Sequence, residues 1–281
     1  MRLLFLGDVV GRSGRDGITA RLPHLIAEYG FDFVVINGEN ASHGRGLTEA
    51  HFAELRAAGA DAVTLGDHAF DQRDTLTYIG REPTLIRPLN MPEGTPGRGA
   101  NLIEARDGRR VLVVNALGRV FMNPVDDPFR AVEAAVATCP LGEQADAVLI
   151  DFHTEATSEI QAMGVFLDGR VSLVVGTHTH IPTADARILR GGTALMADAG
   201  MCGDYNSVIG VDPEEPLSRF LTGISNGRFI PAEGEATLCG IAIETDDKTG
   251  LVARLSPVRV GGTLSQSLPF ALGPTLKGHR P

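Results

Sequence analysis

The chain has 281 residues, of which 43% are hydrophobic and 21% charged, enough apolar material for one globular domain with its own core. Its formal net charge of -10 argues against a groove for long nucleic acids, although a small anion could still bind at a local metal centre. The 3 cysteines are scattered and form no CxxC pair, so neither a disulfide framework nor a zinc ribbon is expected.

The first part of the chain alternates short apolar runs with amphipathic segments. Thr48 is suited to begin a helix, because its hydroxyl group can accept a hydrogen bond from the first turn. The predicted strands are residues 2–6, 33–36 and 61–65, and the predicted helices are residues 18–29 and 48–58. Such alternation is typical of a parallel sheet covered by helices.

The rest of the chain is richer in strands. Predicted strands are residues 85–89, 101–104, 111–117, 147–150, 171–175, 193–197, 236–244 and 251–260; predicted helices run from Asp126 or Asp127 to about residue 137 and over residues 155–166. Turns at 106–109 and 246–250 join neighbouring strands. This pattern predicts an α/β fold in which two mixed β-sheets pack face to face with helices outside. We expect a single domain over residues 1–263 and an extended or partly disordered tail over residues 264–281.

Five of the predicted strands end in residues that can bind a metal ion. The segments are Gly7-Asp8, Asn37-Gly38-Glu39-Asn40, Gly66-Asp67-His68, Asp151-Phe152-His153 and Gly176-Thr177-His178-Thr179-His180. A single Gly-Asp is usually a turn, and a single buried histidine is usually a hydrogen-bonded core residue. Because the carboxyl ends of parallel strands meet at one edge of a sheet, however, five such placements together predict a metal site at that edge.

The same segments resemble the motifs of the calcineurin-like metallophosphoesterases, and in detail those of the bacterial YmdB-like branch. The matching segments are residues 7–14 (Gly-Asp-Val-Val-Gly-Arg-Ser-Gly), 37–41 (Asn-Gly-Glu-Asn-Ala), 151–159, 176–180, 198–201 and 207–210. The resemblance extends over nearly the whole chain except the tail. It implies the four-layer sandwich of that superfamily, with helices on the outer faces of two sheets.

The resemblance also implies a centre with two divalent metal ions. Asp8, Glu39, Asn40 and His180 would hold one ion, Glu39, Asp67, His153 and His178 would hold the other, and His68 would be the proton donor. It implies a phosphodiesterase that opens small cyclic nucleotides, 2',3'-cyclic nucleotides to 3'-phosphates, through a hydroxide shared by the ions. The resemblance favours iron, and carboxylate, amide and imidazole ligands also suit manganese or zinc.

Two positions depart from the superfamily pattern. Val10 stands where a histidine is usual, as is normal for the branch, and Asn40 would take over that coordination. Asp67 stands where an asparagine is usual. A carboxylate oxygen can still bind a metal ion, but an ionised Asp67 removes one positive charge from the centre. We therefore expect tighter metal binding and a weaker attraction for an anionic phosphate.

Residues near these motifs are candidates for substrate contacts. His43, Arg12 and Arg45 lie in loops beside the first two motifs and could contact a phosphate, although ordinary surface roles are an alternative for each. Asp151 and Glu155 could orient the ligating histidines, and Glu155 could instead cap a helix.

Two other functions remain open from the sequence. One is a phosphomonoesterase or phosphoprotein phosphatase, and the other is a regulatory module that binds a nucleotide without turnover. The apolar run at residues 3–6 is too short for a signal peptide, and no stretch is long enough to span a membrane, so we expect a cytoplasmic protein without a membrane partner. A small phosphodiester is the expected partner, and a homo-oligomer remains open.

Overall fold

The computed structural model describes residues 1–270, whose strands form two β-sheets. The first sheet has the order β11-β12-β1-β2-β3-β4, and β13 also pairs with β12. Its strands are β1 (Arg2–Leu6), β2 (Phe33–Asn37), β3 (Ala62–Thr64), β4 (Leu85–Ile86), β11 (Cys202–Asp204), β12 (Ala236–Thr245) and β13 (Val252–Val260). The second sheet has the order β5-β6-β7-β8-β10-β9. Its strands are β5 (Ala100–Glu104), β6 (Arg110–Leu117), β7 (Ala147–His153), β8 (Leu173–Thr177), β9 (Arg187–Ile188) and β10 (Ala194–Met196).

Each sheet contains a parallel centre and antiparallel outer strands. In the first sheet β1 to β4 run parallel, and in the second β6, β7, β8 and β10 do. The pairings of β12 with β1, β11 and β13 are antiparallel, as are those of β5 with β6 and of β9 with β10. Both sheets are therefore mixed, which confirms the predicted fold class. The carboxyl ends of the parallel strands of each sheet consequently lie at one edge.

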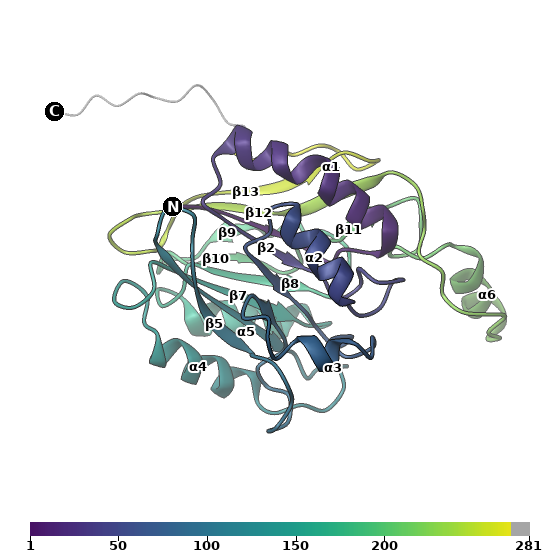
Figure 1. Ribbon diagram of the computed structural model, residues 1–281, viewed down its shortest axis with the longest axis horizontal. Coiled ribbons are helices and arrows are strands. Elements are labelled where there is room, and N and C mark those ends of the chain that lie inside the picture. The colour runs from purple at the N-terminus through teal and green to yellow at the C-terminus, as the bar shows by residue number, and fades with distance from the viewer. Residues whose placement is uncertain (271–281) are drawn as a thin grey trace.

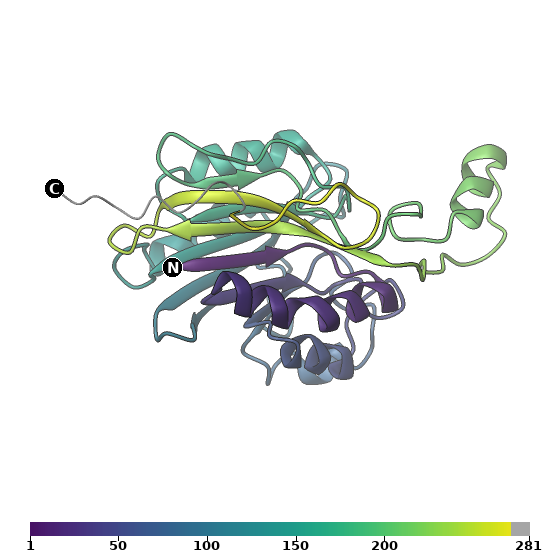
Figure 2. The ribbon, with the colours of Figure 1, turned by 90° about the horizontal axis from the view of Figure 1, so that it is seen from above.

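The sheets and helices form four layers, which Figures 1 and 2 show from two directions. Alternate residues of β1 illustrate the packing, because Leu3 and Phe5 lie in the core between the sheets while Leu4 and Leu6 face the helices on the outer side. Helices α1 (Gly11–Tyr29) and α2 (Glu49–Ala57) cover the first sheet, and α4 (Pro128–Thr138) and α5 (Thr157–Leu167) cover the second. The short helix α3 (Thr75–Tyr78) lies near α2.

Local sequence signals explain where several helices begin. The hydroxyl of Thr48 accepts a hydrogen bond from the backbone N–H of His51 at 3.3 Å, which confirms its predicted capping role in α2. Helix α4 follows Asp127, whose side chain accepts from the N–H of Phe129 at 2.9 Å, and Pro128 occupies the first turn.

Helix α1 begins at Gly11, earlier than the predicted start at residue 18. Its first turns contain glycines because the helix lies directly against the first sheet. A Cβ on Gly14 would collide with the carbonyl oxygen of Cys202, and one on Gly17 would lie 2.8 Å from the Cβ of Ala236. Close packing through glycine therefore removed the apolar periodicity on which the prediction depended.

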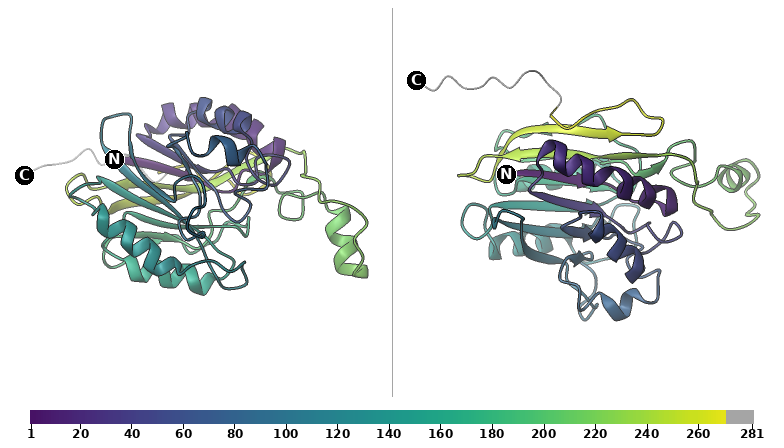
Figure 3. Two further views of the ribbon diagram at one scale, coloured as in Figure 1. Left: turned by 60° about the horizontal axis from the view of Figure 1, so that its bottom comes forward. Right: turned by 45° about the horizontal axis from the view of Figure 1, so that its top comes forward.

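An arm that the sequence did not predict extends from the body. We call residues 208–231 the arm; it contains helix α6 (Glu214–Thr222) and is closed at its base by a bridge between Val211 and Pro231. Figures 2 and 3 show it projecting beyond the edge of the sheets where β1 ends. Leu217, Phe220 and Leu221 of α6 are exposed.

The predicted tail is only partly described. Residues 264–270 contain an isolated antiparallel bridge between Arg259 and Ser267, and Phe270 packs against the core that α1 covers. Residues 271–281, the rest of the predicted tail, lie outside the described residues. Within the described part of the chain, no helix combines the length and the apolar character that crossing a membrane would require.

Candidate metal centre

Ends of strands from both sheets meet at one site. Glu39 follows β2, Asp67 follows β3, His153 is the last residue of β7, and His178 follows β8. One ligand atom from each of these four side chains lies within 4.8 Å of the other three. The site therefore lies where the edges of the two sheets come together, which explains why its residues are far apart in the sequence.

The distances show how tightly the donor atoms converge. Nε2 of His153 lies 3.1 Å from Oε1 of Glu39 and 3.1 Å from Oδ1 of Asp67. Nδ1 of His178 lies 3.0 Å from Nε2 of His153 and 3.7 Å from Oδ1 of Asp67. Two imidazoles and two carboxylates with converging donor atoms form a ligand set that suits a divalent transition-metal ion.

A second group of donors lies beside the first. Asp8 and Asn40 are buried, and within the described residues Oδ1 of Asp8 and Oδ1 of Asn40 have no hydrogen-bond partner. Nε2 of His180 lies 3.9 Å from Oδ1 of Asp8, while the other ring nitrogen donates to the carbonyl of Ile209 at 2.7 Å. Because Nδ1 carries the proton in that hydrogen bond, Nε2 keeps a lone pair that can bind a metal ion. Buried oxygens without a partner are costly, so these groups fit a cation.

Without a metal ion, the buried carboxylates and His153 of the cluster shift one another's pKa values. Burial raises the pKa of Asp8 to about 7. Burial would also raise the pKa of Glu39, but the neighbouring His153 lowers it below the usual range. For His153 the effect of burial is exceeded by Glu39 and Asp67, which raise its pKa well above the ordinary value. A bound cation would replace the proton on His153 as the positive charge among these carboxylates.

The backbone around the cluster is unusual. His178 and His180 have φ angles of 109° and 67°, which non-glycine residues adopt rarely. Gly66, directly before Asp67, has no room for a side chain, because a Cβ there would collide with Oε2 of Glu39 and the ring of His153. The glycine in this motif therefore allows the ligand atoms to approach the backbone closely.

His153 is held in place by a chain of hydrogen bonds. The hydroxyl of Thr177 donates to Oδ1 of Asp151 at 2.7 Å and accepts from Nδ1 of His153 at 2.9 Å. This fixes the tautomer that presents Nε2 to the cluster. The sequence pointed to Asp151 as an orienting residue but missed Thr177, although it stands inside the motif that contains His178. Oε2 of Glu155 lies 3.4 Å from Nε2 of His178.

His68 lies at the margin of the cluster. Its backbone N–H donates to Oε2 of Glu39 at 3.2 Å, and its Nδ1 donates to Oδ2 of Asp71 at 3.1 Å. Its side chain lines a pocket of about 520 Å³. The other polar residues at this end of the pocket are Glu39, Asn40, His43, Arg45, Glu155, His178, Thr179 and His180.

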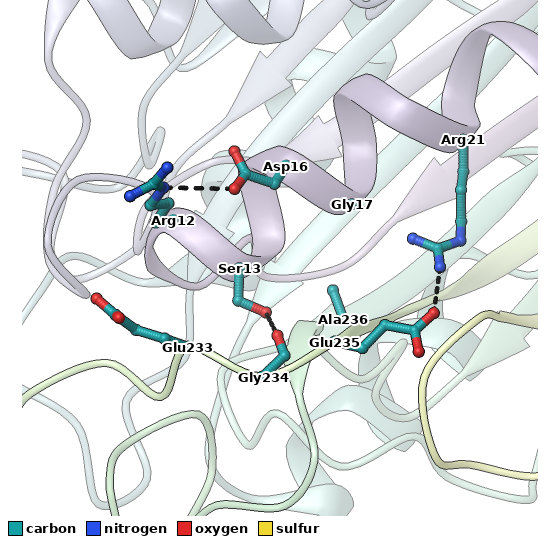
Figure 4. Close-up of a pocket in the computed structure, with 9 residues that line it drawn as sticks. All are labelled: Arg12, Ser13, Asp16, Gly17, Arg21, Glu233, Gly234, Glu235 and Ala236. Carbon is teal, nitrogen blue, oxygen red and sulfur yellow. Dashed lines mark hydrogen bonds and ion pairs between the residues drawn. The ribbon is translucent and has the colours of Figure 1, made fainter.

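The three expected substrate contacts are therefore divided between two places. His43 and Arg45 line the pocket beside His68. Arg12 lies instead in a separate cleft of about 330 Å³ between α1 and the start of β12, where it forms an ion pair with Asp16 at 3.4 Å (Figure 4). The turn that opens α1 directs Arg12 along the helix, so nearness in sequence to Asp8 did not bring it to the cluster.

Metallophosphoesterases typically have two packed mixed sheets, with imidazoles and carboxylates gathered where the parallel strands have their C-terminal ends. The chain belongs to the family described as YmdB-like protein, whose model matches residues 4–258. This confirms the family to which the sequence motifs pointed.

Individual relatives agree with that placement. The chain is 45% identical over 260 residues to the 2',3'-cyclic-nucleotide 2'-phosphodiesterase of Bacillus subtilis (strain 168), an alignment covering 92% of this chain and 97% of the relative. The structure of a hypothetical protein from Thermus thermophilus superimposes with a TM-score of 0.86 at 41% identity, covering 94% of this chain and 100% of that one. A novel phosphatase of Mycoplasma pneumoniae also gives a TM-score of 0.86, at 34% identity and with 93% of each chain covered.

Proposed function

We propose that this protein is a two-metal phosphodiesterase that hydrolyses 2',3'-cyclic nucleotides to 3'-phosphates. The observation that carries the proposal is the convergence of Glu39, Asp67, His153 and His178 within 4.8 Å, with Glu39 and His178 also lining the pocket of about 520 Å³. The activity of the Bacillus subtilis relative supports this choice of substrate over the phosphomonoester and sensor alternatives.

The donor atoms divide into two ligand sets. Glu39, Asp67, His153 and His178 would hold one ion, and Asp8, Asn40 and His180 would hold the other, with Glu39 shared between them. When bound, such ions polarise phosphoryl oxygens and lower the pKa of a water molecule. The two oxygens of Asp8 and Asn40 without a partner support the second set. Iron as the metal, with manganese or zinc as alternatives, and the cytoplasm as the compartment are part of the same proposal.

His68 supplies the proton that the leaving group needs. Asp71 accepts the hydrogen bond from Nδ1 of His68, so Nε2 is the nitrogen left to donate to the departing oxygen. This step matters because the sugar alkoxide released from a cyclic nucleotide is a poor leaving group without a proton. Arg45 and His43 lie in the same pocket and would contact the phosphate.

A comparison of substrates tests the proposal. The metal-loaded protein should hydrolyse bis-p-nitrophenyl phosphate in preference to p-nitrophenyl phosphate, and 2',3'-cyclic AMP in preference to 3',5'-cyclic AMP. Metal analysis of the same sample should find two ions per chain. Preference for the monoester would favour the phosphomonoesterase alternative instead. Tight nucleotide binding without hydrolysis of any diester would favour the sensor.

A further inference from the structure

The pocket has two chemically different ends. One end carries the metal-binding cluster and His68. The other end is formed by the arm, and every side chain that the arm contributes to the lining is apolar. These residues are Val208, Ile209, Val211, Pro216, Phe220, Phe229 and Pro231. At about 520 Å³ the pocket is within the range of small-ligand sites, and a phosphodiester at the cluster would leave its substituent facing the apolar end.

The base of the arm is joined to the metal-binding cluster. The carbonyl oxygen of Ile209 accepts the hydrogen bond from Nδ1 of His180 at 2.7 Å, so the arm and one candidate metal ligand are positioned together. The bridge between Val211 and Pro231 and the hydrogen bond from the N–H of Asp212 to the carbonyl of Ile230, at 2.8 Å, close the base. The base of the arm therefore has a fixed place beside His180.

Two aromatic rings of the arm differ in how they are held. The guanidinium of Arg219 lies over the ring of Phe229, 4.1 Å from its centroid, and Glu215 holds Arg219 at 2.7 Å. Phe229 is therefore fixed in the pocket wall. Phe220 is 86% exposed although it lines the pocket, so its side chain is available to a ligand. An exposed ring beside a phosphoester centre suits stacking with a flat heteroaromatic group.

We propose that the arm supplies a nucleobase subsite in which Phe220 stacks on the base of a bound nucleotide, with Ile209 and Phe229 forming the apolar wall. This inference rests on the proposed phosphodiesterase function. Because the lining from the arm is apolar, the base is held by stacking and apolar contact and not by hydrogen bonds to its edge. The subsite consequently accepts any of the four bases and distinguishes nucleotides from phosphodiesters without a base.

Substitution of Phe220 tests the subsite, with its neighbour as the matched control. Phe220 and Leu221 are both on the exposed surface of α6, at 86% and 81%, but only Phe220 is among the lining residues. Phe220→Ala should raise the KM for 2',3'-cyclic AMP about 10-fold, as loss of one base–aromatic stack predicts, with little change in kcat. The KM for 1-O-methylribose 2,3-cyclic phosphate, which lacks a base, should stay the same. Leu221→Ala should change neither the KM nor the kcat for 2',3'-cyclic AMP. Phe220→Tyr keeps an aromatic ring and should retain the wild-type KM.

A binding measurement separates this proposal from the proposed function. The Kd of 3'-AMP should rise about 10-fold in Phe220→Ala while the Kd of inorganic phosphate stays constant, a result that needs no turnover. Equal changes for 3'-AMP and phosphate, no change for either, or the same loss in Leu221→Ala would reject the subsite. A failure of the wild-type protein to hydrolyse any diester would reject the proposed function and leave the binding result to decide on the subsite.

Discussion

The edge of the sheets that carries the metal-binding cluster and the arm that projects beyond it share one pocket, yet they are built in opposite ways. At the edge, Asp8 and His153 are 0% exposed and each follows or ends a buried strand. On the arm, Phe220 is 86% exposed and belongs to a helix of which only Pro216 is buried. The comparison indicates that the reacting groups need a rigid scaffold, whereas the variable part of a substrate can be met by a surface element.

The two regions also differ in the free-energy penalty of burying charged groups. Burial raises the pKa of Asp8 to about 7, and that of Asp198, which accepts a hydrogen bond from the backbone N–H of Thr179 at 2.9 Å, also to about 7; burial thus disfavours the ionised forms of both in the chain alone. The arm buries little and carries no comparable penalty. Substitutions at the edge should therefore affect metal binding or the chemical step, while substitutions on the arm should affect only the binding of the ligand.

Replacement of Glu39 should have the largest effect. Glu39→Gln keeps the shape of the side chain but removes the charge that the two proposed ligand sets share. We expect kcat/KM for 2',3'-cyclic AMP to fall by about 10⁴-fold or more, because the ions supply several kcal/mol of transition-state stabilisation. Elemental analysis should show fewer ions per chain. Leu221→Ala on the arm is the control, and full metal content with full activity in Glu39→Gln would contradict the assignment of the chemistry to the edge.

His68→Ala should show a loss that depends on the leaving group. The backbone N–H of His68 holds Glu39, and alanine retains that contact, so metal content should be unchanged. The kcat for 2',3'-cyclic AMP should fall about 10²-fold or more, the usual contribution of a general acid. Bis-p-nitrophenyl phosphate should lose much less, because p-nitrophenolate leaves without protonation. Equal losses on the two substrates would mean that His68 does not act as the proton donor.

The metal-binding edge could be predicted from the sequence because its signal is local. Glu39 and His178 stand within two residues of the ends of strands that are buried, largely apolar runs, and the topology of parallel strands brings such ends together. The family motifs then implied which of these residues would bind the metal ions. Thr177 was missed because a hydroxyl inside a strand has an ordinary structural role in most proteins, and its partner Asp151 becomes visible only when β7 and β8 lie side by side.

The arm was missed for a different reason. Leu217, Phe220 and Leu221 are spaced as on one face of a helix, but α6 is short and this face covers no core, so the pattern alone does not place the helix in the fold. Phe220 and Phe229 line the same pocket as His178 and His180. The sequence does not indicate that these distant residues share a pocket. Arg12, for which the sequence left open a phosphate contact or an ordinary surface role, lines the separate cleft beside α1 and pairs with Asp16.

Thr177→Val should weaken metal binding although Thr177 is not one of the proposed metal ligands. Valine has nearly the same shape as threonine but leaves Nδ1 of His153 and Oδ1 of Asp151 without their shared partner. We expect the metal affinity to fall about 10- to 100-fold, as for other residues that orient a ligating histidine. Thr177→Ser retains the hydroxyl and should retain most of the affinity in a metal titration. Equal affinities for the valine and serine variants would show that the edge does not depend on this hydrogen bond.

Asp67→Asn should have the smallest effect on KM. It should weaken metal binding but strengthen the binding of an anionic substrate. The carboxylate of Asp67 lies 3.1 Å from Nε2 of His153, inside the proposed ligand set, and an amide would keep one oxygen donor while removing a negative charge. Metal binding should weaken. The KM for 2',3'-cyclic AMP, measured with saturating metal, should fall at least about 4-fold, the effect of one unit charge roughly 5 Å away at the dielectric of water.

Inorganic phosphate gives this last comparison a direct readout. Its Kd for the metal-saturated variant should fall together with the KM, because both report attraction of an anion to the edge, whereas stacking on Phe220 of the arm should be unaffected. The ratio of the Kd of 3'-AMP to the Kd of phosphate should then be the same in wild type and Asp67→Asn. A KM that is unchanged or higher in the variant would show that the charge of Asp67 does not limit phosphate binding, and that the edge is tuned by coordination geometry instead.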